Sequence, residues 1–156
     1  MLSRILQEGY GPGAWHGADI KAAVSEVSEA EAFKRPGDGR SPSTGSGLRH
    51  NIAEIAVHHA YYVHSVRGRL SSAKPEPFPF EGDDWFALEN KSTVSWSEVR
   101  ELLDAQASRL ATLVADIESG KVKASKDEAA VLELVLGITC HSAYHAGQIL
   151  LIRKLI

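Results

Sequence analysis

The sequence predicts an all-α protein folded as a four-helix bundle. Four segments carry apolar residues at helical spacing, and loops rich in glycine, proline and serine separate them. No segment reads as a convincing strand, although residues 121–124 can form a short extended piece. Helices with one apolar stripe bury that stripe against each other. At 156 residues the chain has the size of one domain, so we expect residues 1–156 to form a single bundle.

The first predicted helix starts at Asp19 and fades at residues 35–37, Arg-Pro-Gly. The breaker Gly-Pro-Gly at residues 11–13 limits residues 2–8 to a short helical turn or a tail. Residues 36–47, rich in Gly, Pro, Ser and Thr, form a loop. The apolar positions that recur at helical spacing in this first helix are Ile20, Ala23, Val24, Val27 and Ala30.

The second predicted helix starts at Gly47 or Leu48 and ends near Gly68 or Leu70. The following segment, 71–84, has a proline at every second position from 75 to 79. Each proline removes an N–H donor and disfavours helix in its neighbour, so this segment is an extended connection.

The third and fourth predicted helices each begin with the Ser-x-x-Glu pattern of a capping box. The third starts around residues 95–97 and ends at Gly120. Gln106 falls on its apolar stripe, either as a buried polar residue with a partner in the core or at the edge of the stripe. The fourth helix starts at Ser125 and runs to about Lys154.

Composition and charge restrict the classes of partner. The formal net charge is −3 and the Lys and Arg residues are scattered, whereas a nucleic-acid-binding surface usually forms a basic stripe. No run of about eighteen apolar residues and no signal-peptide core is present, so we expect a cytoplasmic protein without nucleic-acid or membrane partners. The single cysteine, Cys140, rules out an internal disulfide and suits a reducing compartment. It points about 100° away from its neighbour His141 on a helix, so we expect a buried, inert thiol.

Two histidines, His141 and His145, lie four residues apart in the fourth predicted helix. Residues at i and i+4 share a helix face, with Cβ atoms roughly 5–6 Å apart, so their ring nitrogens can converge on one metal ion. The face is otherwise apolar apart from Gln148, which places the rings in the core, and Gly137 leaves room beside them. The alternative is a pair of core histidines satisfied by neighbouring hydrogen bonds. A chain of this size folds without a metal, so a metal here is functional rather than structural.

A third ligand has several candidates, and helical periodicity does not decide between them. His58 and His59 are one step apart around the second predicted helix, and spacing alone ranks neither above the other. His64 falls near the opposite side of that helix. The full set of candidates is His16, His50, His58, His59 and His64.

Two segments resemble the DinB/YfiT-like metalloenzyme superfamily. Residues 144–152, Tyr-His-Ala-Gly-Gln-Ile-Leu-Leu-Ile, resemble the last helix of that family, which carries two histidines at i and i+4. His141 and His145 match these two positions. Residues 50–58, His-Asn-Ile-Ala-Glu-Ile-Ala-Val-His, resemble a second family segment whose final histidine is the remaining ligand.

The resemblance extends over essentially the whole chain, in order. Weaker matches lie at residues 14–17, Ala-Trp-His-Gly, and 67–70, Arg-Gly-Arg-Leu. Ala53 departs from the family pattern, which has tryptophan or another large residue at this position. The smaller side chain either leaves more space beside the metal site or means that the second predicted helix packs differently. Residues 41–47, rich in Gly and Ser, replace a more apolar entry to the second helix.

The resemblance implies that His58, His141 and His145 hold one divalent metal ion in a bundle of up-down-down-up type. Three protein ligands leave a position for water or substrate, which is the pattern of a catalytic site. Imidazole suits several metals, and we expect zinc in the cell, with nickel or iron as alternatives. The residues expected to border the ligands are Glu54, Gln148, Tyr144 and His50.

The wider superfamily includes thiol S-transferases that use low-molecular-weight thiols and a thiol-dependent maleylpyruvate isomerase. The resemblance therefore implies a metal-dependent thiol S-transferase, whose partners are a small-molecule substrate and a thiol bound to the metal as thiolate. One alternative is a metal-dependent hydrolase with Glu54 as its base. Another is a non-catalytic protein of metal binding or stress response. Apolar faces left over on the third and fourth helices can also support a homodimer.

Overall fold

The computed structural model describes residues 1–37, 49–82, 84–88 and 94–156. Within these residues the protein is all-helical, as predicted, and contains no strand. The described helices number six where the sequence predicted four. They are α1 (Leu2–Tyr10), α2 (Ile20–Ser25), α3 (Glu29–Phe33), α4 (Ile52–Leu70), α5 (Trp96–Glu118) and α6 (Glu128–Arg153).

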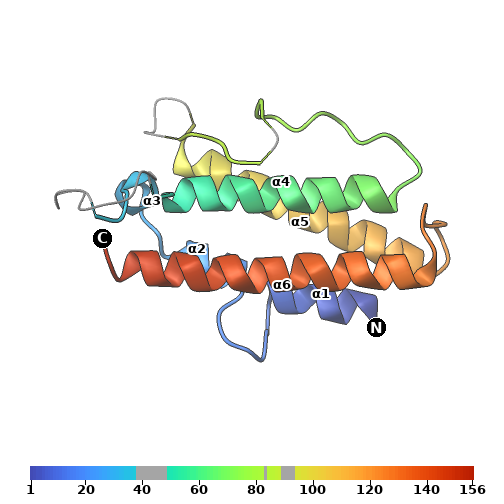
Figure 1. Ribbon diagram of the computed structural model, residues 1–156. Helices are drawn as coiled ribbons and strands as arrows, with labels where there is room; N and C mark the ends of the chain where they lie inside the picture. The colour runs from blue at the N-terminus through green and yellow to red at the C-terminus, as the bar shows by residue number, and fades with distance from the viewer. Residues whose placement is uncertain (38–48, 83, 89–93) are drawn as a thin grey trace.

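Three long helices, α4, α5 and α6, form the body of the molecule, and α1 lies along α6 (Figure 1). α4 packs against α5 and α6, α1 packs against α6 and α5, α2 packs against α6, and α3 packs against α4. The chain runs in one direction along α4 and α5 and in the opposite direction along α1 and α6 (Figure 1). α1 is longer than the predicted short turn because Leu2, Ile5 and Leu6 pack on apolar residues of the long helices.

The first predicted helix is two short helices, α2 and α3, separated at residues 26–28. Asp19 caps α2 with its side chain, as a helix start at this position requires. Ser28 then caps α3 in a capping box with Glu31. Val27 is nevertheless buried at the break between α2 and α3. The apolar spacing therefore continues across the break, and the sequence pattern does not reveal that the helix is interrupted.

α4 begins later than predicted. The predicted start at Gly47 or Leu48 lies outside the described residues, as does most of the loop 36–47, but residues 49–51 are not helical. Asn51 caps the helix by accepting a hydrogen bond from the backbone N–H of Glu54 at 2.8 Å. The carboxylate of Glu54 accepts in return from the backbone N–H of Asn51 at 3.3 Å. This reciprocal pair fixes the start of α4 at Ile52.

The two remaining long helices differ in how they start. α5 begins at the predicted capping box, formed by Ser95 and Glu98. α6 is capped by Asp127 rather than by Ser125. The hydroxyl of Ser125 donates instead to a backbone carbonyl at the end of α4, 2.7 Å away, and ties the loop before α6 to that helix.

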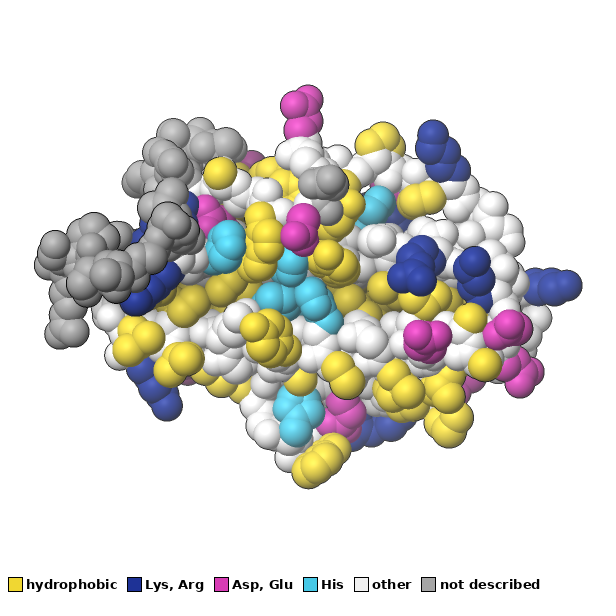
Figure 2. Space-filling model, in the orientation of Figure 1, with side chains coloured by type: hydrophobic (Ala, Val, Ile, Leu, Met, Phe, Trp, Pro, Cys, Tyr) yellow, Lys and Arg dark blue, Asp and Glu magenta, His cyan; other side chains and the backbone are white. Residues whose placement is uncertain are grey.

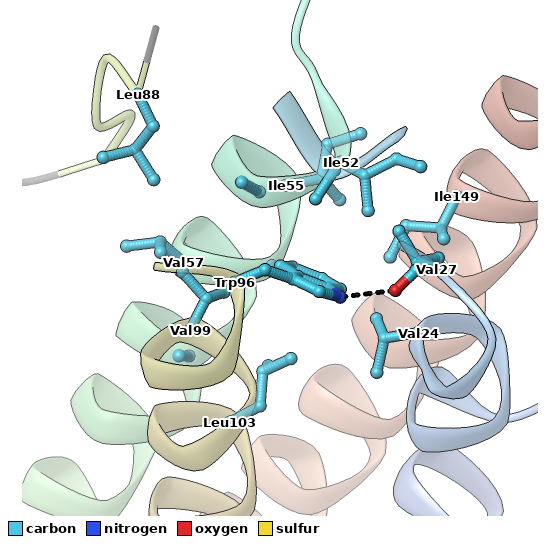
Figure 3. Close-up of a cluster of buried hydrophobic side chains, with 14 of the residues drawn as sticks. Val24, Val27, Ile52, Ile55, Val57, Leu88, Trp96, Val99, Leu103 and Ile149 are labelled. Carbon is cyan, nitrogen blue, oxygen red and sulfur yellow. Dashed lines mark hydrogen bonds between the residues drawn. The ribbon is translucent and has the colours of Figure 1, made fainter. Parts of the chain in front are cut away.

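The apolar core consists of two clusters. One surrounds Trp96, whose indole N–H donates to the backbone carbonyl of Val27 at 2.7 Å (Figure 3). The other surrounds Leu110, Val114 and Val135. Along α6, polar side chains separate the residues of the first cluster from those of the second, and on α4 His58 and His59 lie near the end of the first cluster, one turn before Val63 of the second. This separating set, named the histidine layer below, consists of His58, His59, His141, Ser142 and His145.

α6 is long and apolar enough, by length and composition, to cross a membrane, and 39 % of its most apolar window is buried. The expectation of a protein without a membrane partner stays a prediction, because length and composition alone do not decide it. One side of α6 packs against α1, α2 and α4.

Candidate metal centre

The structure brings three of the predicted histidines together in the histidine layer. His58 projects from α4, and His141 and His145 project from consecutive turns of α6. One ring nitrogen of each histidine lies within 4.8 Å of the others, and the ring centroids of His141 and His145 are 4.3 Å apart. His58 and His145 are buried and His141 is half-buried. The three rings form a cluster that can hold one ion.

Two of these rings have an acceptor at their outer nitrogen. Nδ1 of His58 lies 2.9 Å from the backbone carbonyl of Asp84 and 3.2 Å from its carboxylate. Nδ1 of His145 lies 2.6 Å from Oε1 of Gln148, whose amide group donates to the hydroxyl of Tyr144 at 3.0 Å. These acceptors place the ring proton on Nδ1 and leave the lone pair of Nε2 free, as in metal-binding histidines.

The Nε2 atoms, which face the centre of the cluster, show whether a metal ion fits there. Nε2 of His141 and Nε2 of His145 are buried, and within the described residues neither has a hydrogen-bond partner. A buried polar atom without a partner costs about 1–3 kcal/mol, and native proteins avoid it. Two such atoms in one cluster of rings fit a shared ligand, and imidazole nitrogen suits zinc, nickel and iron. The side chains present therefore fit a divalent metal ion.

The clustered histidines are neutral at physiological pH. Burial, together with the proximity of His145 and His58, lowers the pKa of His141 from 6.5 to about 4. Burial lowers the pKa of His145 to about 4 as well, against the opposing effect of the hydrogen bond to Gln148. The pKa of His58 is also lowered, chiefly by burial. Because metals bind neutral imidazole, these rings need lose no charge before an ion binds.

The metal-free protein is expected to lose stability as the pH falls from about 6.5 to about 4. In this range the unfolded chain takes up protons on His141 and His145 while the folded chain does not, so the free energy of unfolding falls with acid. After allowance for solvent screening we expect a loss of about 2–4 kcal/mol. Urea unfolding between pH 7 and pH 4 measures it. The double variant His141→Gln/His145→Gln should lose most of this slope; an unchanged slope would contradict the assignment.

The four residues predicted to border the ligands divide into two pairs. Gln148 contacts one clustered ring directly, and Tyr144 supports Gln148. Glu54 and His50 contact each other instead, with Nδ1 of His50 3.1 Å from Oε2 of Glu54. Glu54 also accepts two hydrogen bonds from Arg35. Glu54 therefore orients His50 and not one of the three clustered rings. Its carboxylate is bonded to Arg35 and His50, so it is not directed at the cluster, where the base of a hydrolase would have to act.

Asp84 and Trp85 also border the cluster, and Asp84 was not among the residues predicted to do so. The indole of Trp85 stacks on His58, with centroids 3.9 Å apart, and on His50, with centroids 3.6 Å apart. The hydroxyl of Tyr62 donates to the carboxylate of Asp84 at 3.1 Å. Both residues come from the end of the proline-rich connection, and their sequence carried no spacing signal that links them to α4.

The other candidate histidines lie outside the cluster. His59 is buried on the next step around α4, with Nε2 2.8 Å from the hydroxyl of Ser142. His64 is buried on the other side of α4, and Gln106 is 3 % exposed, which places that glutamine within the core rather than at the edge of the stripe of α5. His16 is exposed, with Nε2 2.7 Å from a backbone carbonyl of α1. The structure thus distinguishes His58 from His59, which periodicity did not.

Two expectations about α6 are wrong. Gly137 was expected beside the rings and Cys140 in the core, but both are exposed. The most buried stripe of α6 is centred on Ile138, Ser142 and Ile149. His145, 2 % exposed, lies within this stripe, whereas His141 is half-buried at its edge, so Gly137, one turn before His141, faces outward.

A cavity of about 830 Å³ lies among α1, α2 and α5, and its lining includes His59 and Ser142. None of the three clustered histidines lines it. Figure 2 shows histidine side chains at the centre of the face that α4 and α6 present, with apolar side chains around them. The cluster is therefore approached from this face and not from the cavity.

The comparison with known protein families is consistent with this geometry. The family model of the DinB superfamily matches residues 14–149, a range that includes all three clustered histidines. No curated protein and no solved structure matches the chain. Because the family match spans most of the 156 residues, the chain belongs to the DinB superfamily.

Proposed function

We propose that this chain is a metal-dependent enzyme in which His58, His141 and His145 bind one divalent ion and a small thiol occupies the open position. The pair of buried Nε2 atoms without a partner carries this proposal. Three protein ligands leave a coordination position open. When bound, the ion lowers the pKa of a coordinating thiol and so supplies a thiolate nucleophile at neutral pH. The reaction class is transfer of the thiol sulfur to a small electrophilic substrate, with release of its leaving group.

The residues around the cluster orient and shield that position. Asp84 and Gln148 hold the rings of His58 and His145 with Nε2 free. Trp85 stacks on His58 and is 38 % exposed, so it forms a wall between the cluster and solvent. The carboxylate of Asp84 touches His58 and is about half exposed.

The proposal includes a bundle of up-down-down-up type, made by α1, α4, α5 and α6. Two observations support it. The directions of these four helices follow that order (Figure 1), and each packs against two of the others, α1 and α4 both against α5 and α6. α2 and α3, which the sequence suggested as a bundle helix, then belong to the connection between α1 and α4.

The proposed setting follows from the same observations. We expect zinc as the cellular ion, with nickel or iron as alternatives, because the cluster offers only imidazole nitrogen. We expect small molecules as partners and the cytoplasm as the compartment, while the net charge of −3 does not favour nucleic acid. A hydrolase is a weaker proposal because Glu54 is engaged by Arg35. A non-catalytic metal-binding protein is weaker because a three-ligand site leaves a position open.

Cobalt-substituted protein tests the thiol step. Adding glutathione or cysteine to the Co²⁺-loaded chain is expected to produce the near-ultraviolet absorption of a cobalt–thiolate bond. The zinc-loaded chain should accelerate consumption of a slow electrophile such as 1-chloro-2,4-dinitrobenzene by the same thiol. The control is His58→Ala, which should show neither effect. Stoichiometric metal binding without either signal would contradict the transferase and favour the non-catalytic alternative, and thiol-independent ester hydrolysis would favour a hydrolase.

A further inference from the structure

The outer face of α6 carries an exposed apolar surface that the proposed function does not use. Of eight large hydrophobic side chains exposed in the described residues, four lie on α6 and the turn that follows it. They are between 43 % and 64 % exposed, and apolar side chains spread along the helix in Figure 2. These four side chains are Leu136, Tyr144, Leu151 and Leu155.

Two glycines lie on the same face, and the chain's own packing does not account for them. A Cβ atom at Gly137 or Gly147 would meet nothing within 4 Å. Glycine in the interior of a helix costs about 0.5–1 kcal/mol relative to alanine. The missing side chains do let a second helix approach closely, so this face fits a helical partner better than it fits open water.

The residues along this face are self-complementary when the helix is reversed. Counting outward from the point between Ala143 and Tyr144, Cys140 corresponds to Gly147 and Leu136 corresponds to Leu151. Further out, Glu133 corresponds to Lys154, and both are exposed. A second α6 laid antiparallel on the first therefore pairs leucine with leucine, cysteine with glycine, and acid with base at each end. A two-fold interface requires this kind of self-pairing surface.

We propose that two copies of this chain associate through an antiparallel contact between their α6 helices, with a two-fold axis near Tyr144. The opposite charges at positions 133 and 154 fix the register of the two helices. A lipid surface does not pair with residues in register, so this pattern favours a second copy of the chain. The hydroxyl of Tyr144 accepts from Gln148, which holds the ring of His145. The contact therefore reaches the group that orients a clustered histidine.

Cysteine crosslinking tests the register. In the proposed dimer Cys140 of one copy faces position 147 of the other, so Gly147→Cys should form a disulfide-linked dimer under diamide oxidation. Wild type should not crosslink, because its two Cys140 residues are about 10 Å apart along the axis, beyond disulfide reach. Gly137→Cys, a glycine with the same open space, is the matched control and should not crosslink. Crosslinking of wild type, or equal crosslinking of both variants, overturns the register.

Light scattering tests the association itself. Wild type should have twice the 16.9 kDa mass of one chain at micromolar concentration. Leu151→Glu should halve that mass with an unchanged circular dichroism spectrum, because Leu151 is 58 % exposed. A wild type that stays monomeric overturns the proposal, and so does a monomer that sediments with phosphatidylglycerol vesicles, since lipid would then cover the face. Neither measurement depends on metal or thiol binding, so the proposed function can fail while the dimer holds.

Discussion

Replacing His145 with alanine is expected to abolish binding of one divalent ion per chain. Within the described part of the chain, the buried Nε2 atoms of His141 and His145 have no hydrogen-bond partner, and after loss of His145 two remaining imidazoles cannot complete the site. Residues that only orient a ligand change metal affinity by about 10–100-fold, so we expect the loss of a ligand to exceed about 100-fold. Mass spectrometry of untagged protein never exposed to a nickel column gives the metal content, and titration with zinc gives the affinity.

Two variants calibrate this result. His16→Ala removes an exposed histidine outside the cluster and should bind metal as wild type does. Gln148→Ala removes the acceptor at Nδ1 of His145 and should weaken binding by about 10–100-fold without abolishing it. If His145→Ala keeps one ion at wild-type affinity, the cluster is not the site. If wild type takes up no ion, the protein is a helical domain with buried histidines.

Replacing Glu54 with alanine is expected to give the largest loss of stability, about 3–5 kcal/mol. Glu54 is 2 % exposed and accepts hydrogen bonds from Arg35 at 2.5 and 3.0 Å and from the backbone N–H of Leu88 at 3.0 Å. Burial alone would raise the pKa of Glu54, but these bonds and that from His50 outweigh it and lower the pKa. The stabilisation is therefore complete at pH 7 and is lost only in acid. The expected fall in melting temperature is on the order of 10 °C.

The chain offers a matched control for this substitution. Glu98 has the same position in the capping box of α5 as Glu54 has in that of α4. Glu98 is exposed, so Glu98→Ala should lower the melting temperature far less. Glu54→Gln, which keeps the shape but not the charge, should fall between the two. Equal losses for Glu54→Ala and Glu98→Ala would mean that the helix cap, not the buried ion pair with Arg35, sets the stability.

Local patterns predicted much of the fold and of the site. The i, i+4 spacing of His141 and His145 placed both rings on one helix face, and the resemblance selected His58 as their neighbour. The Ser-x-x-Glu pattern at Ser95 gave the start of α5. The histidine pair and the helix cap were accessible because each depends on residues within one or two helical turns of each other, whereas His58 was selected by the resemblance and not by spacing.

Contacts between distant segments were not accessible in the same way. Asp84 lies 26 residues from His58 and reaches it only because the connection after α4 folds back over that helix. Two local features of the sequence were also missed, because the apolar pattern around each of them pointed to a different structure. The apolar spacing through Val27 hid the Ser28 cap of α3, and the apolar composition of α6 hid the exposed position of Cys140.

The division of the core into two apolar clusters has a consequence for how the proposed metal ion would bind and leave. The clusters around Trp96 and around Leu110 lie on either side of the histidine layer, and each draws on residues of α4, α5 and α6. The helices are thus held together above and below the site by contacts that involve no ligand. An ion can enter and leave without unfolding the chain, unlike in a zinc finger, whose fold requires its metal. On the proposed function, we therefore expect metal supply to determine whether the protein is active and not whether it folds.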